Sequence, residues 1–144
     1  MEKLYLIATI AAQRVAIRAS VVESVVDLGP VAPVPLAPAH VAGLAALRSK
    51  VLTVICCERA LGLPAREPTG RRAVVINLDG HHYGLGVTSI EDARVIDEPA
   101  KPVRTRLEAG WSRVAIGMLE LDGEALLLID PERIVLGFEE PIAA

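Results

Sequence analysis

The feature that most constrains the fold is an internal repeat, because the chain carries one pattern of turns and apolar residues twice. An offset of 74 residues places 43–62 over 117–136 with six identities in 20 positions, where this composition would give roughly two by chance. The identical pairs are Gly43/Gly117, Leu47/Leu121, Leu52/Leu126, Ile55/Ile129, Glu58/Glu132 and Arg59/Arg133. A second offset of 68 residues aligns 14–23 with 82–91, so that apolar positions of one segment fall on apolar positions of the other. The repeat predicts two modules of similar plan, approximately residues 1–63 and 71–138.

Tight turns between short apolar runs indicate that both modules are built from β-strands. Asp79-Gly80 and Asp122-Gly123 each separate two such runs, and Asp-Gly readily supplies the positive φ angles of a type I′ hairpin turn. The run Leu4–Ile10 is typical of a first strand. We therefore expect an all-β chain.

Helix is expected only as short turns. Ser20 with Glu23, and Thr88 with Glu91, have the spacing of a capping box, in which a hydroxyl and a carboxylate satisfy the free amides of one helical turn. Asp130 before a proline is typical of an N-cap. The expected helical turns lie near Val21–Ser24, Glu58–Leu61 and Pro131–Leu136.

Three segments are expected to be irregular connections. Residues 29–38 contain four prolines, whose locked φ and missing amides forbid helix and central strand. Residues 97–112 are the corresponding crossover of the second module, and 64–70 join the modules.

Composition narrows the class of function. The 144 residues suit a single domain, residues 1–144, and the formal net charge of −3 offers no basic surface for nucleic acid. The run after the start methionine is too short to span a bilayer, so we expect no membrane insertion. Cys56 and Cys57 are adjacent and cannot join distant parts of the fold by a disulfide, which favours a reducing, cytoplasmic setting.

The residues that could carry chemistry do not form a recognisable site. Neighbouring residues of a strand point to opposite faces, so neither Cys56/Cys57 nor His81/His82 converges readily on one ion, even with His40. We expect no metal, no organic cofactor and no enzymatic activity. A small-molecule-binding or Cys-dependent enzymatic β-barrel, using Cys57 and a histidine, stays open as the alternative.

The order of motifs along the chain resembles the signature of CheW-like domains, the adaptor family of bacterial chemotaxis. The resemblance covers essentially the whole chain, and its specificity lies in the combined order. The matching segments are Val34-Pro35 with Pro38, then 41–48, 51–55, 61–63, 84–87 and 117–129.

The resemblance implies a fold and a role. The implied fold is two intertwined five-stranded β-barrel subdomains resembling SH3 barrels, which can exchange strands. The implied role is a non-catalytic scaffold for signal transduction, which binds the regulatory domain of a CheA-like histidine kinase and the cytoplasmic tip of a chemoreceptor. The implied place is the cytoplasm, at the inner face of the membrane through receptor arrays.

Four residues are candidates for partner binding. Arg48 and Gly43 match the arginine and preceding glycine that are characteristic of the family. The resemblance places Val22 beside the groove that receives the receptor, and Ile90 is its equivalent under the 68-residue offset, although burial would explain both. Arg48 has Asp122 as its counterpart in the repeat. We expect Arg48 to be exposed at a hairpin tip or strand end formed by a bulge or longer loop, as an interface anchor or else as a solvated charge.

Overall fold

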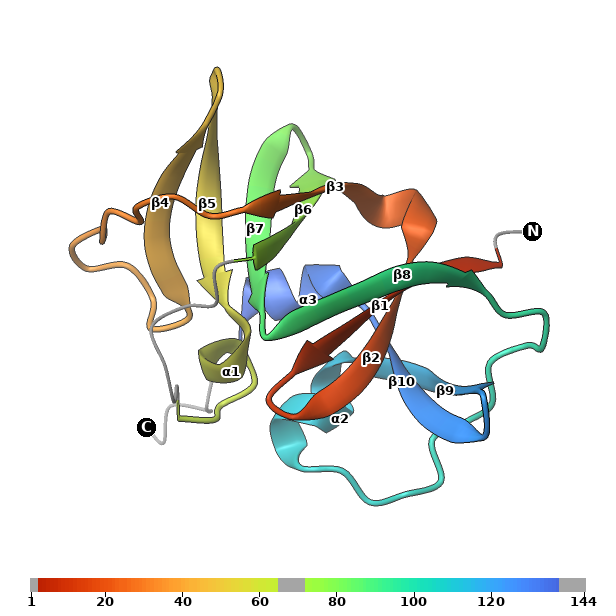
Figure 1. Cartoon of the computed structure of the whole chain (residues 1–144). Coiled ribbons are helices and arrows are strands. Elements are labelled where there is room, and N and C mark those ends of the chain that lie inside the picture. The colour runs from red at the N-terminus through yellow and green to blue at the C-terminus, as the bar shows by residue number, and fades with distance from the viewer. Residues whose placement is uncertain (1–2, 65–71, 138–144) are drawn as a thin grey trace, which may run out of the picture.

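The structure is a computed structural model that describes residues 3–64 and 72–137, in which ten strands form two five-stranded sheets (Figure 1). Sheet A has the order β8-β1-β2-β10-β9, with β1 at Leu4–Ile10, β2 at Gln13–Arg18, β8 at Ser89–Val95, β9 at Ala115–Leu121 and β10 at Glu124–Ile129. Sheet B has the order β3-β6-β7-β5-β4, with β3 at Val22–Asp27, β4 at Val41–Leu47, β5 at Lys50–Cys56, β6 at Arg72–Leu78 and β7 at His81–Val87. The helices are short: the 3₁₀-helix η1 at Ala19–Val21, then α1 at Cys57–Ala60, α2 at Ala109–Val114 and α3 at Pro131–Leu136.

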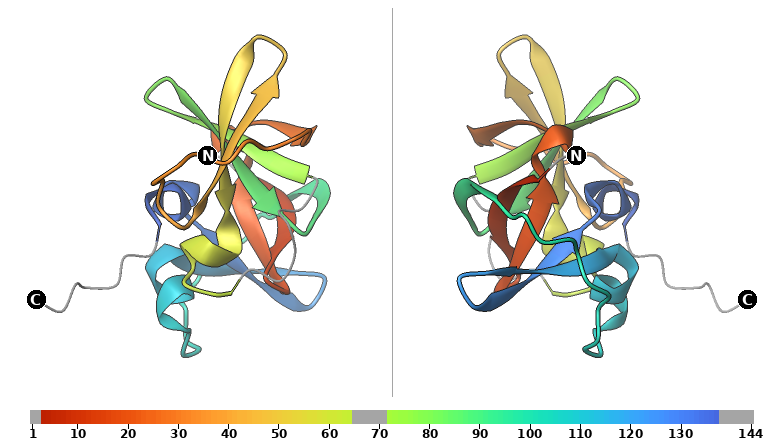
Figure 2. Two further views of the ribbon diagram at one scale, coloured as in Figure 1. Left: turned by 90° about the vertical axis from the view of Figure 1, so that its left-hand side faces the viewer. Right: turned by 90° about the vertical axis from the view of Figure 1, so that its right-hand side faces the viewer.

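The two sheets have the same plan, and each takes strands from both halves of the chain. If five is added to each strand number of sheet A, and the count restarts at β1 after β10, the order β8-β1-β2-β10-β9 becomes β3-β6-β7-β5-β4, which is the order of sheet B. The chain passes from sheet A to sheet B between β2 and β3 and returns between β7 and β8. Each sheet contains one parallel pair, β10 with β2 and β5 with β7. The sheets are therefore intertwined, as Figure 2 shows from two further sides.

The central strands of sheet A, β1, β2 and β10, are buried on both faces, which explains the nearly continuous apolar run of β1. Leu6, Ala8 and Ile10 face a core shared with sheet B, whereas Tyr5 and Ile7 face a smaller core inside sheet A. Strands covered on both sides lose the usual alternation of apolar and polar residues. Ile55, Val74, Ile76, Leu85 and Val87 supply the contribution of sheet B to the shared core.

The hairpin predictions are confirmed. The turn between β6 and β7 has φ of 51° at Asp79 and 85° at Gly80, and the turn between β9 and β10 has 52° at Asp122 and 83° at Gly123. Positive φ at both central residues is the type I′ geometry that matches the right-handed twist of the strands. The first strand also has the predicted bounds.

Two of the three predicted helical turns are confirmed. Helix α3 has the predicted bounds, and the Asp130 carboxylate accepts a hydrogen bond from the Glu132 amide at 3.0 Å, as an N-cap does. Helix α1 overlaps the turn predicted at 58–61.

Both predicted capping boxes are wrong. Ser20 lies inside η1, whose N-cap is Arg18 with no side-chain hydrogen bond, and the chain is extended again from Val22. Thr88 lies between β7 and β8, and its amide donates to the Thr9 carbonyl instead of starting a helix. The valine-rich run after Ser20 and the β-branched Ile90 after Thr88 favour strand over helix, and the two glutamates lie in β3 and β8.

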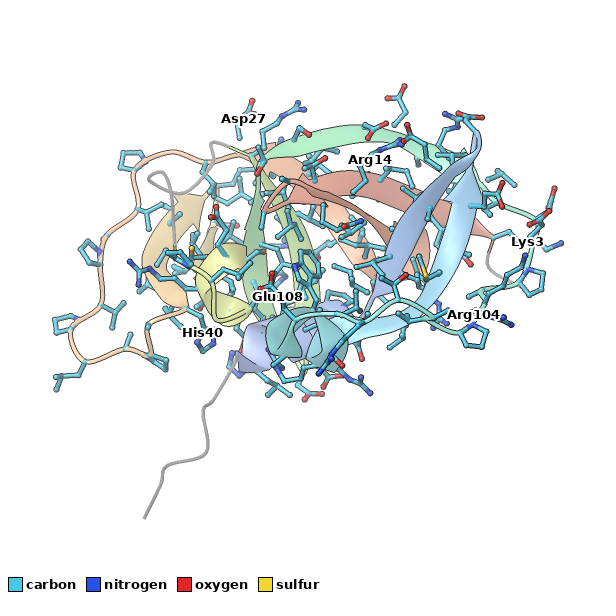
Figure 3. The ribbon with its side chains drawn as sticks, turned by 90° about the horizontal axis from the view of Figure 1, so that it is seen from below. Lys3, Arg14, Asp27, His40, Arg104 and Glu108 are labelled. Carbon is cyan, nitrogen blue, oxygen red and sulfur yellow. The ribbon has the colours of Figure 1, made fainter. Side chains whose placement is uncertain are left out.

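The two glutamates of these patterns pair with basic residues two strands away in the same sheet, across β1 in sheet A and across β6 in sheet B. Arg14 donates to Glu91 at 2.9 and 2.8 Å, and also pairs with a glutamate of β10 (Figure 3). His82 Nε2 lies 3.3 Å from Glu23 Oε2. The 68-residue offset aligns Arg14 with His82 and Glu23 with Glu91. The repeat thus places a glutamate and a basic residue at equivalent positions in the two sheets, each pair joining residues from different halves of the chain.

Helix α2 was not predicted, because residues 97–112 were expected to be irregular. It buries Trp111 and Val114 in the shared core. The absence of a side chain at Gly110 allows the Leu61 carbonyl to approach, since an added Cβ would lie 1.8 Å from that oxygen.

The two crossover segments, residues 29–38 and 97–112, each pair with an edge strand, and they do so at equivalent positions of the repeat. Ala32 and Leu44 exchange two backbone hydrogen bonds of 2.8 and 2.9 Å on β4. Lys101 and Met118 do the same on β9 at 2.8 and 2.7 Å. Leu44 and Met118 are related by the 74-residue offset, so the repeat extends to how the crossovers are held.

Candidate binding surfaces

Arg48 is exposed at the tip of the β4–β5 hairpin, the highest point of the molecule in Figure 1. Leu47 pairs with Lys50, so Arg48-Ser49 is a two-residue turn. The expected bulge or longer loop at this turn is therefore wrong. Arg48 adopts a φ of 55° itself, and the irregularity of the hairpin lies at its other end, between Val41 and Gly43.

The equivalent turns differ in charge and in partners. Asp122 Oδ2 lies 3.4 Å from Arg94 Nη2. The Arg48 guanidinium makes no hydrogen bond or ion pair within the described residues. Arg48 is thus a cation that the fold presents to solvent at the tip of the β4–β5 hairpin.

The outer face of the same hairpin is apolar. Leu44 pairs with Thr53 and Ala46 with Val51, and these four residues lie on the face opposite Ala45 and the barrel interior. The exposed fraction is 40% for Leu44 and 62% for Val51. Exposed apolar area beside a free arginine is typical of a protein-binding surface.

Gly43 is buried, and its role in this surface is to shape the hairpin. Its φ is 151°, and an added Cβ would lie 2.2 Å from the Ala32 carbonyl oxygen. Only glycine allows the crossover to come this close to β4. Whether its backbone also touches a partner stays a prediction.

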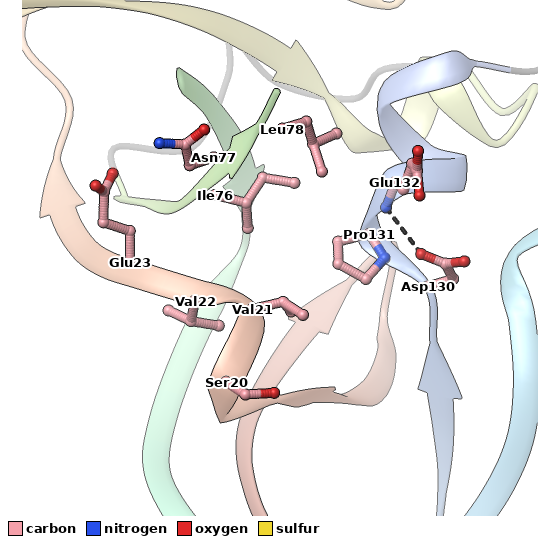
Figure 4. Close-up of a pocket in the computed structure, with 10 residues that line it drawn as sticks. All are labelled: Ser20, Val21, Val22, Glu23, Ile76, Asn77, Leu78, Asp130, Pro131 and Glu132. Carbon is pink, nitrogen blue, oxygen red and sulfur yellow. Dashed lines mark hydrogen bonds between the residues drawn. The ribbon is translucent and has the colours of Figure 1, made fainter. Parts of the chain in front are cut away.

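A groove of about 460 Å³ lies where β3, β6 and α3 meet (Figure 4). Its lining residues come from distant parts of the chain: Ser20, Val21, Val22, Glu23, Ile76, Asn77, Leu78, Asp130, Pro131 and Glu132. Val22 pairs with Ile76 at the end of the β3–β6 ladder, so the groove lies where that ladder ends. The N-terminus of α3 forms the facing wall.

Val22 and Ile90 have different surroundings despite their equivalence in the sequence. Both are half-buried and pack against the shared core. Val22 lines the groove, whereas Ile90 pairs with Ala8 in sheet A and is not among the groove residues. The structure brings Val22 together with Ile76 and Pro131, and leaves Arg48, Gly43 and Ile90 elsewhere.

The thiols and imidazoles do not form a reactive centre. Cys57 is 2% exposed, and burial raises the pKa of its thiol, whereas a working nucleophile needs access and a lowered pKa. His40 Nε2 lies 2.8 Å from the Val135 carbonyl oxygen at the end of α3 (His40 is labelled in Figure 3). Within residues 3–64 and 72–137, no three His, Cys, Asp or Glu side chains are grouped to hold a metal ion. The Cys-dependent alternative has no support from this geometry.

The helices of the described segments are all too short to cross a lipid bilayer.

The groove residues of β6 and α3 were not found from the sequence. Ile76, Leu78 and Pro131 look like ordinary core or helix-start residues, and only the pairing of β3 with β6 brings them to Val22. The offset of 68 residues gave a partial signal, since it marked Val22 as part of a repeated element.

Two intertwined β-sheets that carry an exposed hairpin and an apolar groove define a protein-interaction module. The chain belongs to the CheW-like domain family, which matches residues 4–137.

Two individual relatives agree with this assignment. "Chemotaxis protein CheW" of Rhizobium meliloti (strain 1021) is 28% identical over 106 residues, which cover 70% of this chain and 66% of that protein. The match therefore spans slightly less than two thirds of the relative's length. The crystal structure of scaffolding protein TtCheW from Thermoanaerobacter tengcongensis superimposes with a TM-score of 0.76 over 90% of both chains at 21% identity. The expected fold class, two intertwined SH3-like five-stranded subdomains, is confirmed.

Proposed function

We propose that this chain is a non-catalytic adaptor that couples chemoreceptors to a histidine kinase in chemotaxis signalling. The observation that supports it most is Arg48, a cation at a hairpin tip with no partner among the described residues. An exposed arginine beside apolar area suits an anchor for another protein better than it suits folding. The two relatives described above, a chemotaxis protein and a scaffolding protein, support the same role.

The two surfaces serve two partners in this proposal. The β4–β5 hairpin, with Arg48 at its tip and Gly43 shaping its base, binds the regulatory domain of a CheA-like kinase. The groove lined by Val22 binds the cytoplasmic tip of a chemoreceptor. Arg48 is not among the groove residues, so the proposal assigns the two partners to separate surfaces. The complex lies in the cytoplasm, at the inner face of the membrane, because the receptors hold it there.

The test is affinity capture with the whole chain as bait. A folded, tagged protein is incubated with cytoplasmic and detergent-solubilised membrane extracts of the source organism, and retained proteins are identified by mass spectrometry. We expect a histidine kinase and a chemoreceptor. Retention of neither by a protein with a native dichroism spectrum would contradict the adaptor function.

A further inference from the structure

The ionisable residues that line the groove all carry the same sign of charge. They are Glu23 on the β3 wall and Asp130 and Glu132 at the start of α3, and no lysine, arginine or histidine is among the ten lining residues. Figure 4 shows Glu23 and Glu132 on opposite sides of the groove. The apolar lining residues are Val21, Val22, Ile76, Leu78 and Pro131, and the uncharged polar ones are Ser20 and Asn77. An occupant therefore meets an apolar strip flanked by carboxylates.

Two of the three carboxylates already have cationic partners outside the groove. Glu23 Oε1 lies 3.6 Å from Lys50 Nζ, and its other oxygen faces His82. Asp130 Oδ2 lies 3.6 Å from Arg133 Nε.

Glu132 differs from both. Its side chain is exposed, and within the described parts of the chain its carboxylate makes no ion pair or hydrogen bond. It stands on the rim of the groove in the first turn of α3. It is the groove carboxylate whose charge is available to a ligand.

The groove geometry favours a helix over an added strand. Strand addition relies on backbone hydrogen bonds along a free strand edge, whereas this groove is lined by side chains from η1, β3, β6 and α3. A groove walled by side chains of several elements accepts the apolar stripe of an amphipathic helix, with its polar residues at the rims.

We propose that the groove selects a partner helix that carries a lysine or arginine beside its apolar stripe, and that Glu132 is the specificity residue that pairs with this cation. The inference rests on the proposed function, since it names the chemistry of the segment that the groove receives. Complementary charge at a rim sets the choice of partner and the rate of encounter more than it sets total affinity.

Three synthetic helical peptides provide the probe. They share one Leu/Val stripe and differ only in the residues beside it, which are Lys, Gln or Glu. Binding to the full-length, ¹⁵N-labelled protein is followed by NMR at the Val22, Ile76 and Glu132 amides. At low salt we expect the Lys peptide to bind about tenfold more tightly than the Glu peptide, with the difference shrinking as salt screens the charges.

Variants at the groove rim then test whether Glu132 causes the preference for the Lys peptide. Glu132→Lys should reverse it, so that the Glu peptide binds better, and Glu132→Gln should abolish it without placing a positive charge at the start of α3. Glu120→Lys is the matched control, being an exposed glutamate on β9 outside the groove, and should leave the preference unchanged. Equal binding of the Lys and Glu peptides, no binding of any peptide at the groove, or a preference that survives Glu132→Lys would each overturn the proposal. Retention of the kinase by the same variants is measured separately, so failure of this inference is distinguishable from failure of the adaptor function.

Discussion

The Ala32 carbonyl oxygen occupies the space that a side chain at Gly43 would need, 2.2 Å from the position of its Cβ. This contact fixes the proline-rich crossover against β4 and so sets the base of the hairpin that carries Arg48. Gly117, the equivalent of Gly43 in the second module, makes a similar but less close contact. At Gly117 an added Cβ would lie 3.1 Å from the Ala100 side chain and 3.3 Å from the Lys101 carbonyl oxygen.

Gly43→Ala should therefore destabilise the protein by about 2–4 kcal/mol, because it combines a backbone clash with a φ that side chains rarely adopt. Gly117→Ala should cost less, and Gly29→Ala, where nothing lies within 4 Å, should change stability little. Urea unfolding of the three variants measures the order. Equal free energies of unfolding for Gly43→Ala and Gly29→Ala would show that the crossover does not press on β4.

Leu36 is a site where a substitution should stabilise the chain. It is fully exposed and has a φ of 64° in the turn closed by the Ala37 amide and the Val34 carbonyl. Leu36→Gly removes the Cβ that makes this conformation costly, and should raise the free energy of unfolding by up to about 1 kcal/mol. Leu36→Ala keeps the Cβ and is the control. If both variants unfold at the same urea concentration, the strain at this turn is absent.

Arg48→Ala separates binding from folding. We expect kinase affinity to fall by about 2 kcal/mol or more, roughly thirtyfold, if the guanidinium is an interface anchor. Stability should change by less than about 0.5 kcal/mol, because the side chain is exposed and unpaired. Calorimetric titration with the purified kinase and thermal unfolding measure the two quantities. Asp122→Ala, at the equivalent turn, is the control, and unchanged affinity for Arg48→Ala would reassign it to a solvated charge.

Val22 and Ile90 allow the groove to be tested against an equivalent position outside it. Val22→Thr and Ile90→Thr each place a hydroxyl against the shared core and should cost about 1–2 kcal/mol of stability. Only Val22→Thr should also weaken binding of a receptor cytoplasmic fragment, because only Val22 lines the groove. An equal loss of receptor binding with Ile90→Thr would show that the predicted role of Ile90 in partner binding is right.

The thiols give a test of the alternative, a Cys-dependent enzymatic β-barrel. In the native protein Cys57 should react with a thiol reagent far more slowly than an exposed cysteine, because burial both blocks access and disfavours the thiolate. Both thiols should react freely in 6 M guanidinium. Rapid labelling of native Cys57, mapped by mass spectrometry, would restore the enzymatic hypothesis.

The sequence predicted best the elements that depend on local chemistry. The Asp-Gly turns and the Asp130 cap were found because a few adjacent residues determine them. The capping boxes failed because the same spacing of hydroxyl and glutamate occurs in strands, where Glu23 and Glu91 bind cations from other strands. Helix α2 was missed because its stability comes from burying Trp111 and Val114, a tertiary effect.

The binding surfaces show the same contrast between features that local sequence determines and features that arise from tertiary structure. Arg48 was found because the repeat isolates it and the family resemblance gives it a role, but its two-residue turn at φ 55° was not expected of a non-glycine residue. The groove could be predicted only at Val22. Its floor and its acidic rim arise from the pairing of β3 with β6 and the docking of α3, which no local pattern encodes.

The most direct measurement of the central claim is reconstitution of the ternary complex from the purified chain, kinase and receptor fragment, followed by sedimentation. The wild-type chain should bring kinase and receptor into one complex. Arg48→Ala should keep the receptor and lose the kinase, and Val22→Thr should keep the kinase and lose the receptor. Loss of both partners together with either variant, with the fold intact, would contradict an adaptor that binds its two partners through two separate surfaces.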